Sequence, residues 1–223
     1  NAVLGQDDNL FITFANGFDA GAQMNALDVI HDPVSGRNYL FAVMDTATDQ
    51  LKVIDVTDIQ NPALVATRAL SSCVAGSNPE GWRVRYYGGN LYLTTRYTAG
   101  PEFHIFNVTD PTQPSEFAIG SAGCKGFAMG DTVNNLVIQD RLVGGATKRF
   151  AYFATSENDK ELRILDVTNP LNIIEVFIAN QDMPRSQNGL SVFLVGNKLY
   201  FGRQSTPSGP DFYVYDISNP LTG

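Results

Sequence analysis

Four charged side chains in the first half of the chain could form a small catalytic set. Asp28 and His31 are three residues apart, and a carboxylate beside an imidazole can act as a general base. Arg83 and Arg85 can clamp an anionic substrate through bidentate hydrogen bonds. The sequence contains no Gly-x-Ser-x-Gly motif, and no Ser or Cys has a base nearby. We therefore assign no catalytic residue from the sequence alone, and name these four as the set an enzyme would use.

Metal-binding patterns are weak. The two histidines, His31 and His104, are far apart, and the sequence has neither a Cys-x-x-Cys nor a His-x-x-x-His motif. Two acidic clusters, Asp7-Asp8-Asn9 and Glu157-Asn158-Asp159, offer the oxygen ligands that calcium prefers, although such clusters are typical of solvated turns. We expect no metal and no cofactor, with calcium as the alternative.

One short strand pattern, here called the repeat strand, occurs four times and must position any such site. Each copy is rich in β-branched and aromatic residues and ends in an Asx-Val-Thr or Asp-Ile-Ser corner, which is turn chemistry. A spacing of roughly 50 residues is typical of propeller blades with four strands. The four copies are Leu51-Lys52-Val53-Ile54-Asp55-Val56-Thr57, Phe103-His104-Ile105-Phe106-Asn107-Val108-Thr109, Leu162-Arg163-Ile164-Leu165-Asp166-Val167-Thr168 and Phe212-Tyr213-Val214-Tyr215-Asp216-Ile217-Ser218.

Turn residues divide each repeat into four strands. Gly88-Gly89-Asn90 is a strong hairpin signal in the second repeat, and residues 140–149 suggest a longer hairpin loop in the third. The sequence therefore predicts an all-β chain, a single β-propeller domain over residues 1–223. We expect its four blades at residues 24–70, 81–120, 131–180 and 188–223.

The fourth repeat ends without an outer strand, and residues 9–16 resemble the outer strand at residues 173–180. We expect residues 9–16 to complete the last blade of a closed ring of four antiparallel four-stranded blades, because such pairing removes two exposed edges. Two alternatives stay open. The chain could be a four-blade part of a larger propeller, or two chains could pair into a larger ring or form an open stack. A monomer is favoured.

The repeat strand resembles the LVIVD repeat, whose name spells the strand found here at residues 51–55, with Asn61-Pro62 behind it. The resemblance covers all four units. Asn107 replaces the usual Asp and Ile217-Ser218 replaces Val-Thr, and both retain the side-chain bond to the backbone. Similar repeats occur in bacterial and archaeal proteins thought to be exported or surface-attached, and are taken to form propeller blades. The resemblance implies an extracellular or cell-surface location, as a mature form or an excised domain.

Composition argues against two classes of partner. The net charge is −8, so nucleic-acid binding is not expected, because phosphate contacts need a basic patch. No apolar run reaches the length of a membrane helix.

Cys73 and Cys124 lie about one blade period apart, each just after an outer strand, so neighbouring blades could bring them to disulfide distance. We expect this disulfide if the protein is exported, and two buried thiols otherwise.

The acidic surface and the missing catalytic motif favour a non-enzymatic extracellular or cell-surface module that presents a propeller face to a protein or a glycan. The first alternative is a hydrolase or lyase with its site at the channel mouth, using Asp28, His31, Arg83 and Arg85. The second is a structural spacer in a larger surface protein. The residues expected to make binding contacts are Asn25, Gln139, Trp82, Arg96 and Tyr97.

Overall fold

The computed structural model describes residues 16–70, 79–96, 100–119, 125–178, 187–204 and 209–220. Within these ranges every regular element is a β-strand, and all strand pairs are antiparallel. Blade 1 contains β1 (Met24–Asp32), β2 (Arg37–Met44), β3 (Leu51–Asp55) and β4 (Ala63–Arg68); blade 2 contains β5 (Gly81–Tyr87), β6 (Asn90–Thr95), β7 (Phe103–Asn107) and β8 (Ser115–Glu116). Blade 3 contains β9 (Val133–Val143), β10 (Ala146–Thr155), β11 (Leu162–Asp166) and β12 (Ile174–Ile178); blade 4 contains β13 (Gly189–Val195), β14 (Lys198–Arg203) and β15 (Phe212–Asp216). The predicted all-β propeller architecture is confirmed.

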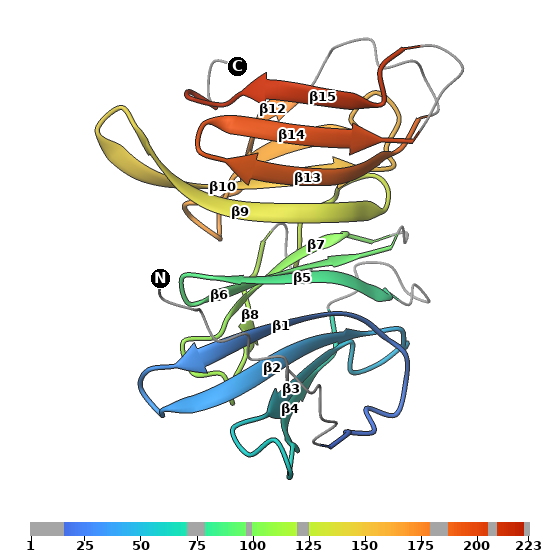
Figure 1. Ribbon diagram of the computed structural model, residues 1–223, viewed down its shortest axis with the longest axis vertical. Coiled ribbons are helices and arrows are strands. Elements are labelled where there is room, and N and C mark those ends of the chain that lie inside the picture. Colours follow the sequence, from blue (N-terminus) through green and yellow to red (C-terminus); the bar gives the residue numbers. More distant parts are fainter. Residues whose placement is uncertain are drawn as a thin grey trace, which may run out of the picture.

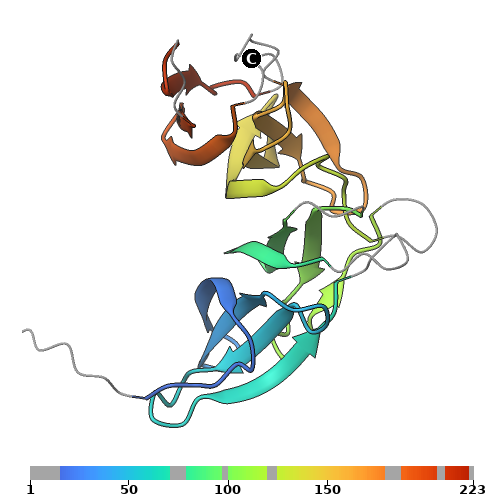
Figure 2. The same ribbon diagram turned by 90° about the vertical axis from the view of Figure 1, so that its right-hand side faces the viewer.

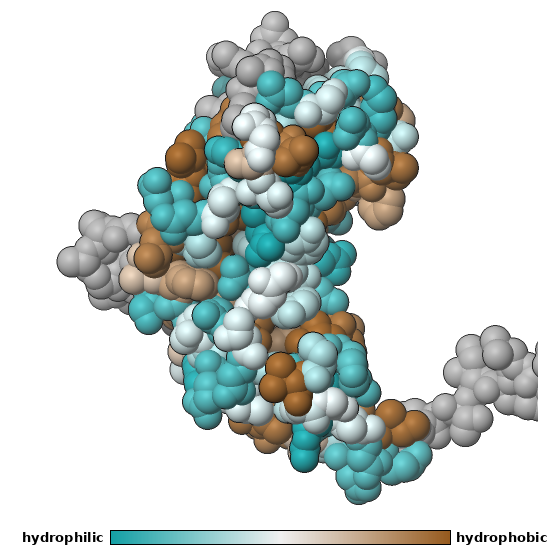
Figure 3. All heavy atoms as spheres, turned by 90° about the vertical axis from the view of Figure 1, so that its left-hand side faces the viewer, coloured by the Kyte–Doolittle hydropathy of each residue, from teal (hydrophilic) through white to brown (hydrophobic). Residues whose placement is uncertain are grey.

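The four blades follow one another in chain order along an arc (Figures 1 and 2). Their inner strands β1, β5, β9 and β13 lie side by side on the concave side of this arc. A view of the atoms from the opposite side shows the same concave side hollowed (Figure 3). Blade 1 and blade 4 lie at the two ends of the arc.

The repeat strand is the third strand of every blade, and its side chains alternate between the two neighbouring blades. Its first and third residues face the next blade. Leu51 and Val53 belong to the apolar cluster between blades 1 and 2, and Phe103 and Ile105 to the cluster between blades 2 and 3. A third cluster fills the junction of blades 3 and 4. The repeat strand therefore supplies the core between blades.

An Asx turn follows each repeat strand. The Oδ1 atom of the Asx residue accepts the backbone N–H two residues later, at 2.9 Å for Asp55, Asn107 and Asp216 and at 3.0 Å for Asp166. Each aspartate also pairs with a cation of the adjacent strand: Arg37 with Asp55 at 2.5 Å, Lys148 with Asp166 at 2.8 Å, and Lys198 with Asp216 at 2.6 Å. The prediction that these corner residues form turns is confirmed.

The first hairpin of blade 3 is long, as predicted, but residues 140–149 are mostly strand and not the turn expected there. Strands β9 and β10 continue through this region and pair as far as Val143 and Ala146. The turn is reduced to Gly144 and Gly145, whose φ angles of 60° and 82° lie in the left-handed region that glycine adopts without strain. The extended strands carry two arginines toward the neighbouring blades.

Several predictions concern residues outside the described ranges. These are the outer strand at residues 9–16, except for Asn16, the acidic cluster at Asp7-Asp8-Asn9, the contact residue Tyr97 and the cysteine pair Cys73 and Cys124. Strand β15 has no outer neighbour among the described residues. The closed ring and the disulfide therefore stay predictions.

Within the described ranges, no helix is long and apolar enough to cross a membrane.

Candidate functional site

A polar cleft opens where the inner strands of blades 1, 2 and 3 begin. Its cavity volume is about 160 Å³, and its lining combines two arginines and two amides with a small apolar floor: Asn25, Ala26, Arg83, Val84, Arg85, Asn135 and Leu136. None of these side chains is acidic. Three residues predicted from the sequence, Asn25, Arg83 and Arg85, are thus brought together.

The two arginines lie on the same face of β5, which is turned toward blade 3. Arg83 donates from Nε to the carbonyl of Asn134 at 2.8 Å and from Nη1 to the carbonyl of Trp82 at 3.0 Å. Burial lowers the pKa of Arg83, and the nearby positive charge of Arg85 lowers it further. Arg85 is exposed and has no hydrogen-bond or ion-pair partner among the described residues. The guanidinium of Arg83 is therefore used in hydrogen bonds within the fold, whereas that of Arg85 can bind a ligand.

The two amide side chains that line the cleft differ as the two arginines do, since one is hydrogen-bonded within the fold and the other is not. Asn25 donates from Nδ2 to the carbonyl of Gly81 at 2.7 Å and accepts a hydrogen bond from Gln23. The side-chain amide of Asn135 makes no hydrogen bond within the described ranges, so it is available beside Arg85. Its neighbour Asn134 instead donates to the carbonyl of Gly189 at 2.7 Å, which joins blade 3 to blade 4.

The predicted general-base pair is not assembled. Asp28 and His31 pair with Phe41 and Asn38 in an unbroken register, so their side chains lie on opposite faces of β1. Asp28 accepts the backbone N–H of Tyr86 at 2.8 Å, while His31 contacts Asn38 at 2.9 Å. Asp28 and His31 are therefore not brought together, because residues three apart on a regular strand point to opposite faces.

The other predicted contact residues have structural partners. The Trp82 ring packs against the guanidinium groups of Arg83 and Arg96, whose central carbons lie 4.3 and 4.1 Å from the ring centre. Arg96 also pairs with Glu80 at 3.4 Å. Gln139 accepts a hydrogen bond of 2.7 Å from Arg141. Trp82 belongs to β5 and Gln139 to β9, and Arg96 follows β6, but none of the three lines the cleft.

A buried polar cluster, missed at the sequence level, lies at the same end of blades 3 and 4. Glu161 is 1% exposed and Arg203 is 5% exposed. Both carboxylate oxygens of Glu161, two guanidinium nitrogens of Arg203 and the hydroxyl of Tyr215 are buried without a hydrogen-bond partner in the described part of the chain. Burial raises the pKa of Glu161, and Arg203 partly opposes that shift. A carboxyl group with a raised pKa can serve as a general acid.

The sequence carries a signal for Glu161 that the repeat alignment overlooked. The residue just before the repeat strand is Gln50 in blade 1 and Glu102 in blade 2, and both are buried. Gln50 accepts a backbone N–H from Leu70 at 2.9 Å, and Glu102 accepts one from Met129 at 2.8 Å. Extending the alignment by one residue would have shown this recurring buried polar position.

The described ranges contain no group of three or more His, Cys, Asp or Glu side chains that could hold an ion. Glu157, from the second predicted calcium cluster, pairs instead with Lys160 at 3.1 Å and with Arg163 at 3.3 Å.

No family model and no curated protein matches this sequence. Several solved structures are similar in arrangement. An exo-β-1,3-galactanase from Phanerochaete chrysosporium is 13% identical, with 93% of this chain and 54% of that one covered at a TM-score of 0.49. A thermostable family-43 glycoside hydrolase is 14% identical, with 91% and 70% covered at 0.46. A Bacteroides ovatus protein described as xyloglucan PUL GH43B is 12% identical, with 86% and 38% covered at 0.45.

These matches correct the first interpretation of the sequence, which was a non-enzymatic binding module. Two of the matched proteins are hydrolases by name, a galactanase and a family-43 glycoside hydrolase. The chain spans about half of the galactanase and less of the Bacteroides protein. Identities this low do not transfer a substrate, so the activity must be argued from the cleft itself.

Proposed function

We propose that this chain is a hydrolase or lyase that binds a carboxylate-bearing substrate, such as an acidic sugar, in the cleft between β1, β5 and β9. The observation that carries the proposal is the unpaired guanidinium of Arg85 beside the free amide of Asn135. An arginine fork matches a carboxylate in geometry and charge, and an amide can bind a neighbouring hydroxyl group.

The electrostatics of the cleft support an anionic ligand. Arg83 and Arg85 lie on one face of β5, and the pKa of Arg83 is lowered first by burial and then by the charge of Arg85. No acidic side chain lines the cleft to neutralise them. A bound carboxylate would relieve this repulsion, and it would do so although the whole protein carries a net charge of −8.

Glu161 is the residue we propose as proton donor. It lies at the same end of the blades as the cleft, and Gly189 connects the two regions. Asn134, beside the cleft, donates to the Gly189 carbonyl, and Gly189 packs directly against the backbone of Glu161. Its raised pKa keeps a proton available closer to neutral pH than an ordinary glutamate would.

Turnover of uronate-containing polysaccharides tests this proposal. A hydrolase releases reducing ends, whereas a lyase also produces an unsaturated uronate that absorbs in the ultraviolet. We expect Arg85→Ala to raise KM and Glu161→Gln to lower kcat by about 10²-fold or more. Arg37→Ala, which removes an exposed arginine at the opposite end of blade 1, is the matched control. Turnover that is unchanged in both site variants would refute the proposal.

An LVIVD-type protein at the cell surface or outside the cell is the setting we propose for this activity. The support is the repeat strand itself, which recurs in all four blades and whose Asx corner is retained in each.

A further inference from the structure

Three arginines of blade 2, Arg85, Arg83 and Arg96, form what we call the cationic row. Arg85 and Arg83 line the cleft from one face of β5, and their α-carbons are about 7 Å apart because they are two residues apart on a strand. Arg96 directly follows β6, and its backbone N–H donates to the carbonyl of Glu80, just before β5, at 3.2 Å. The row therefore runs from the cleft to the end of blade 2 at which β5 begins.

Trp82 connects two members of the row. The guanidinium carbons of Arg83 and Arg96 lie 4.3 and 4.1 Å from the centre of its ring, within the range of cation–π contacts. Burial lowers the pKa of Arg83, and the charges of Arg85 and then Arg96 lower it further. The positive charges of both neighbours therefore act on Arg83, and the indole ring stabilises the two cations that it contacts.

The cationic row is poorly neutralised. Among the described residues, Glu80 has the one carboxylate within ion-pair distance of the three arginines, at 3.4 Å from Arg96. The side chains of Arg96 and Glu80 are 43% and 42% exposed, and pairs as exposed as this contribute little free energy. The guanidinium of Arg96 makes no other hydrogen bond in the part of the chain that the structure describes. It can therefore bind a second anionic group, as Arg85 can bind a first.

The other blades show that the fold does not require these side chains. In all four blades the residue after the second strand donates its backbone N–H to the carbonyl just before the inner strand. That residue is Arg96 in blade 2, but Asp45, Ser156 and Gln204 in blades 1, 3 and 4. The bulged residue of the inner strand is Trp82 in blade 2 and an asparagine in blades 1 and 3. An arginine stacked on a tryptophan at this end is thus particular to blade 2.

We propose that the substrate is an acidic oligosaccharide with several consecutive uronate residues, an inference that rests on the proposed function. The carboxylate of one residue binds Arg85 in the cleft, and the carboxylate of a following residue binds Arg96, which Trp82 holds in place. A row of fixed cations favours a ligand with linked carboxylates, because the second contact forms within a complex that already exists. Trp82 and Arg96, which the sequence predicted as contact residues, thereby belong to a second subsite.

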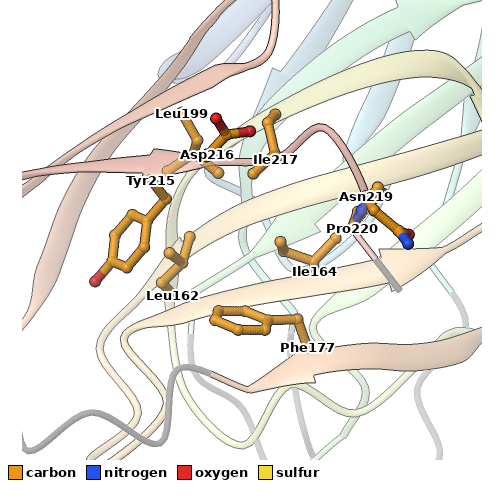
Figure 4. A pocket seen from close by; sticks show the side chains of 9 residues that line it. All are labelled: Leu162, Ile164, Phe177, Leu199, Tyr215, Asp216, Ile217, Asn219 and Pro220. Carbon is orange, nitrogen blue, oxygen red and sulfur yellow. The ribbon is translucent and has the colours of Figure 1, made fainter. Parts of the chain in front are cut away.

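The pocket between the outer parts of blades 3 and 4 does not offer such a ligand a second site (Figure 4). Its lining is mostly apolar and includes no lysine or arginine. Asp216, which lines it, pairs with Lys198 at 2.6 Å, and the two side chains are 56% and 49% exposed. Lys198 begins β14, at the end of blade 4 opposite to the cationic row. Lys198→Ala is therefore a matched control for Arg96→Ala, because each removes one cation from one exposed ion pair.

Isothermal titration calorimetry with galacturonate and trigalacturonate tests the second subsite. We expect the wild-type chain to bind trigalacturonate about tenfold more tightly than galacturonate. In Arg96→Ala this ratio should fall to about threefold, the statistical advantage of a ligand with three carboxylates. In Lys198→Ala the ratio should be that of the wild type. Fully methyl-esterified trigalacturonate keeps the hydroxyl groups without the charge and should bind no more tightly than galacturonate.

The emission of Trp82 locates the bound oligosaccharide, because the chain contains one tryptophan. We expect trigalacturonate to change the tryptophan emission of the wild-type chain with the same saturation curve as the calorimetry. Trigalacturonate that binds without changing this emission would place the second carboxylate elsewhere and overturn the inference.

The two monosaccharide results separate this inference from the proposed function. Galacturonate that does not bind, or that binds equally to the wild type and Arg85→Ala, would refute the proposed function and the inference together. If galacturonate binds through Arg85 but trigalacturonate binds no more tightly, or if the gain survives Arg96→Ala, the inference alone is wrong. A gain that Lys198→Ala also removes would overturn it too, because overall charge would then be the cause.

Discussion

Asp28 accepts the backbone N–H of Tyr86 through Oδ2 at 2.8 Å, a bond that joins the inner strands of blades 1 and 2. Asp28→Ala leaves that N–H without its partner, so we expect a loss of about 1–3 kcal/mol in the free energy of unfolding. Asp28→Asn keeps an acceptor oxygen and should lose less. Urea denaturation of both variants measures the difference. An equal loss in the two would mean that the charge of Asp28, and not this hydrogen bond, matters.

We expect Arg149 to stabilise the junction between blades 2 and 3. It forms a bidentate pair with Asp140, at 2.7 and 3.1 Å, and its guanidinium carbon lies 4.8 Å from the ring centre of Tyr87. We expect Arg149→Ala to cost about 1.5–3 kcal/mol, the range for hydrogen bonds to charged groups. Arg37→Ala removes a pair whose arginine is 59% exposed and should cost less than about 1 kcal/mol. Thermal unfolding distinguishes the two, and equal losses would contradict this expectation.

Glu161 should make stability depend on pH in an unusual direction. Its folded-state pKa is raised by burial, so its protonated form favours the folded state. That contribution is complete below the unfolded pKa of about 4.3 and is lost as the pH rises through the higher folded pKa. Glu161→Gln should therefore leave Tm unchanged near pH 4 and raise it at pH 8. A Tm increase of the same size at both values would exclude titration as the cause.

Asp55 should act in the opposite direction. The hydrogen bond from Thr57 lowers its pKa, and the ion pair with Arg37 adds to this. A lowered pKa gives stability above the unfolded value, and that stability is lost as the pH falls below about 4. Asp55→Asn should keep the Asx turn, as Asn107 does in blade 2, and should flatten the fall in Tm between pH 5 and pH 2, a window set from the same reference values. An unchanged acid profile would contradict this assignment.

The sequence predicted the architecture well because the repeat strand carries two kinds of structural information at once. Alternation placed residues such as Leu51 and Val53 between blades, and the Asx corner fixed where each strand ends. The hairpin of blade 3 was mispredicted as a loop, since polar residues of β9 and β10 resemble loop residues although they bind neighbouring blades. Arg141, which donates to the carbonyl of Gly196, and Arg149, which contacts Tyr87 and Tyr92 of blade 2, are the clearest cases.

The candidate site was predicted only in part, for a physical reason. Arg83 and Arg85 are two residues apart on a strand, so their common face follows from alternation alone. The same rule separates Asp28 from His31, and proximity in sequence was the wrong guide there. Glu161 was missed because the repeat alignment began one residue after it. Its burial also depends on blade 4, which packs over it from more than 25 residues further along the chain.

The most direct test of the proposed function is the binding of glucuronate measured by isothermal titration calorimetry. We predict saturable binding to the wild-type chain, no detectable binding to Arg85→Ala, and unchanged binding to Arg37→Ala, with affinity that weakens as salt concentration rises. Glucuronate binding that is equal in the wild type and Arg85→Ala, or absent in both, would contradict the assignment of the cleft as an anion site.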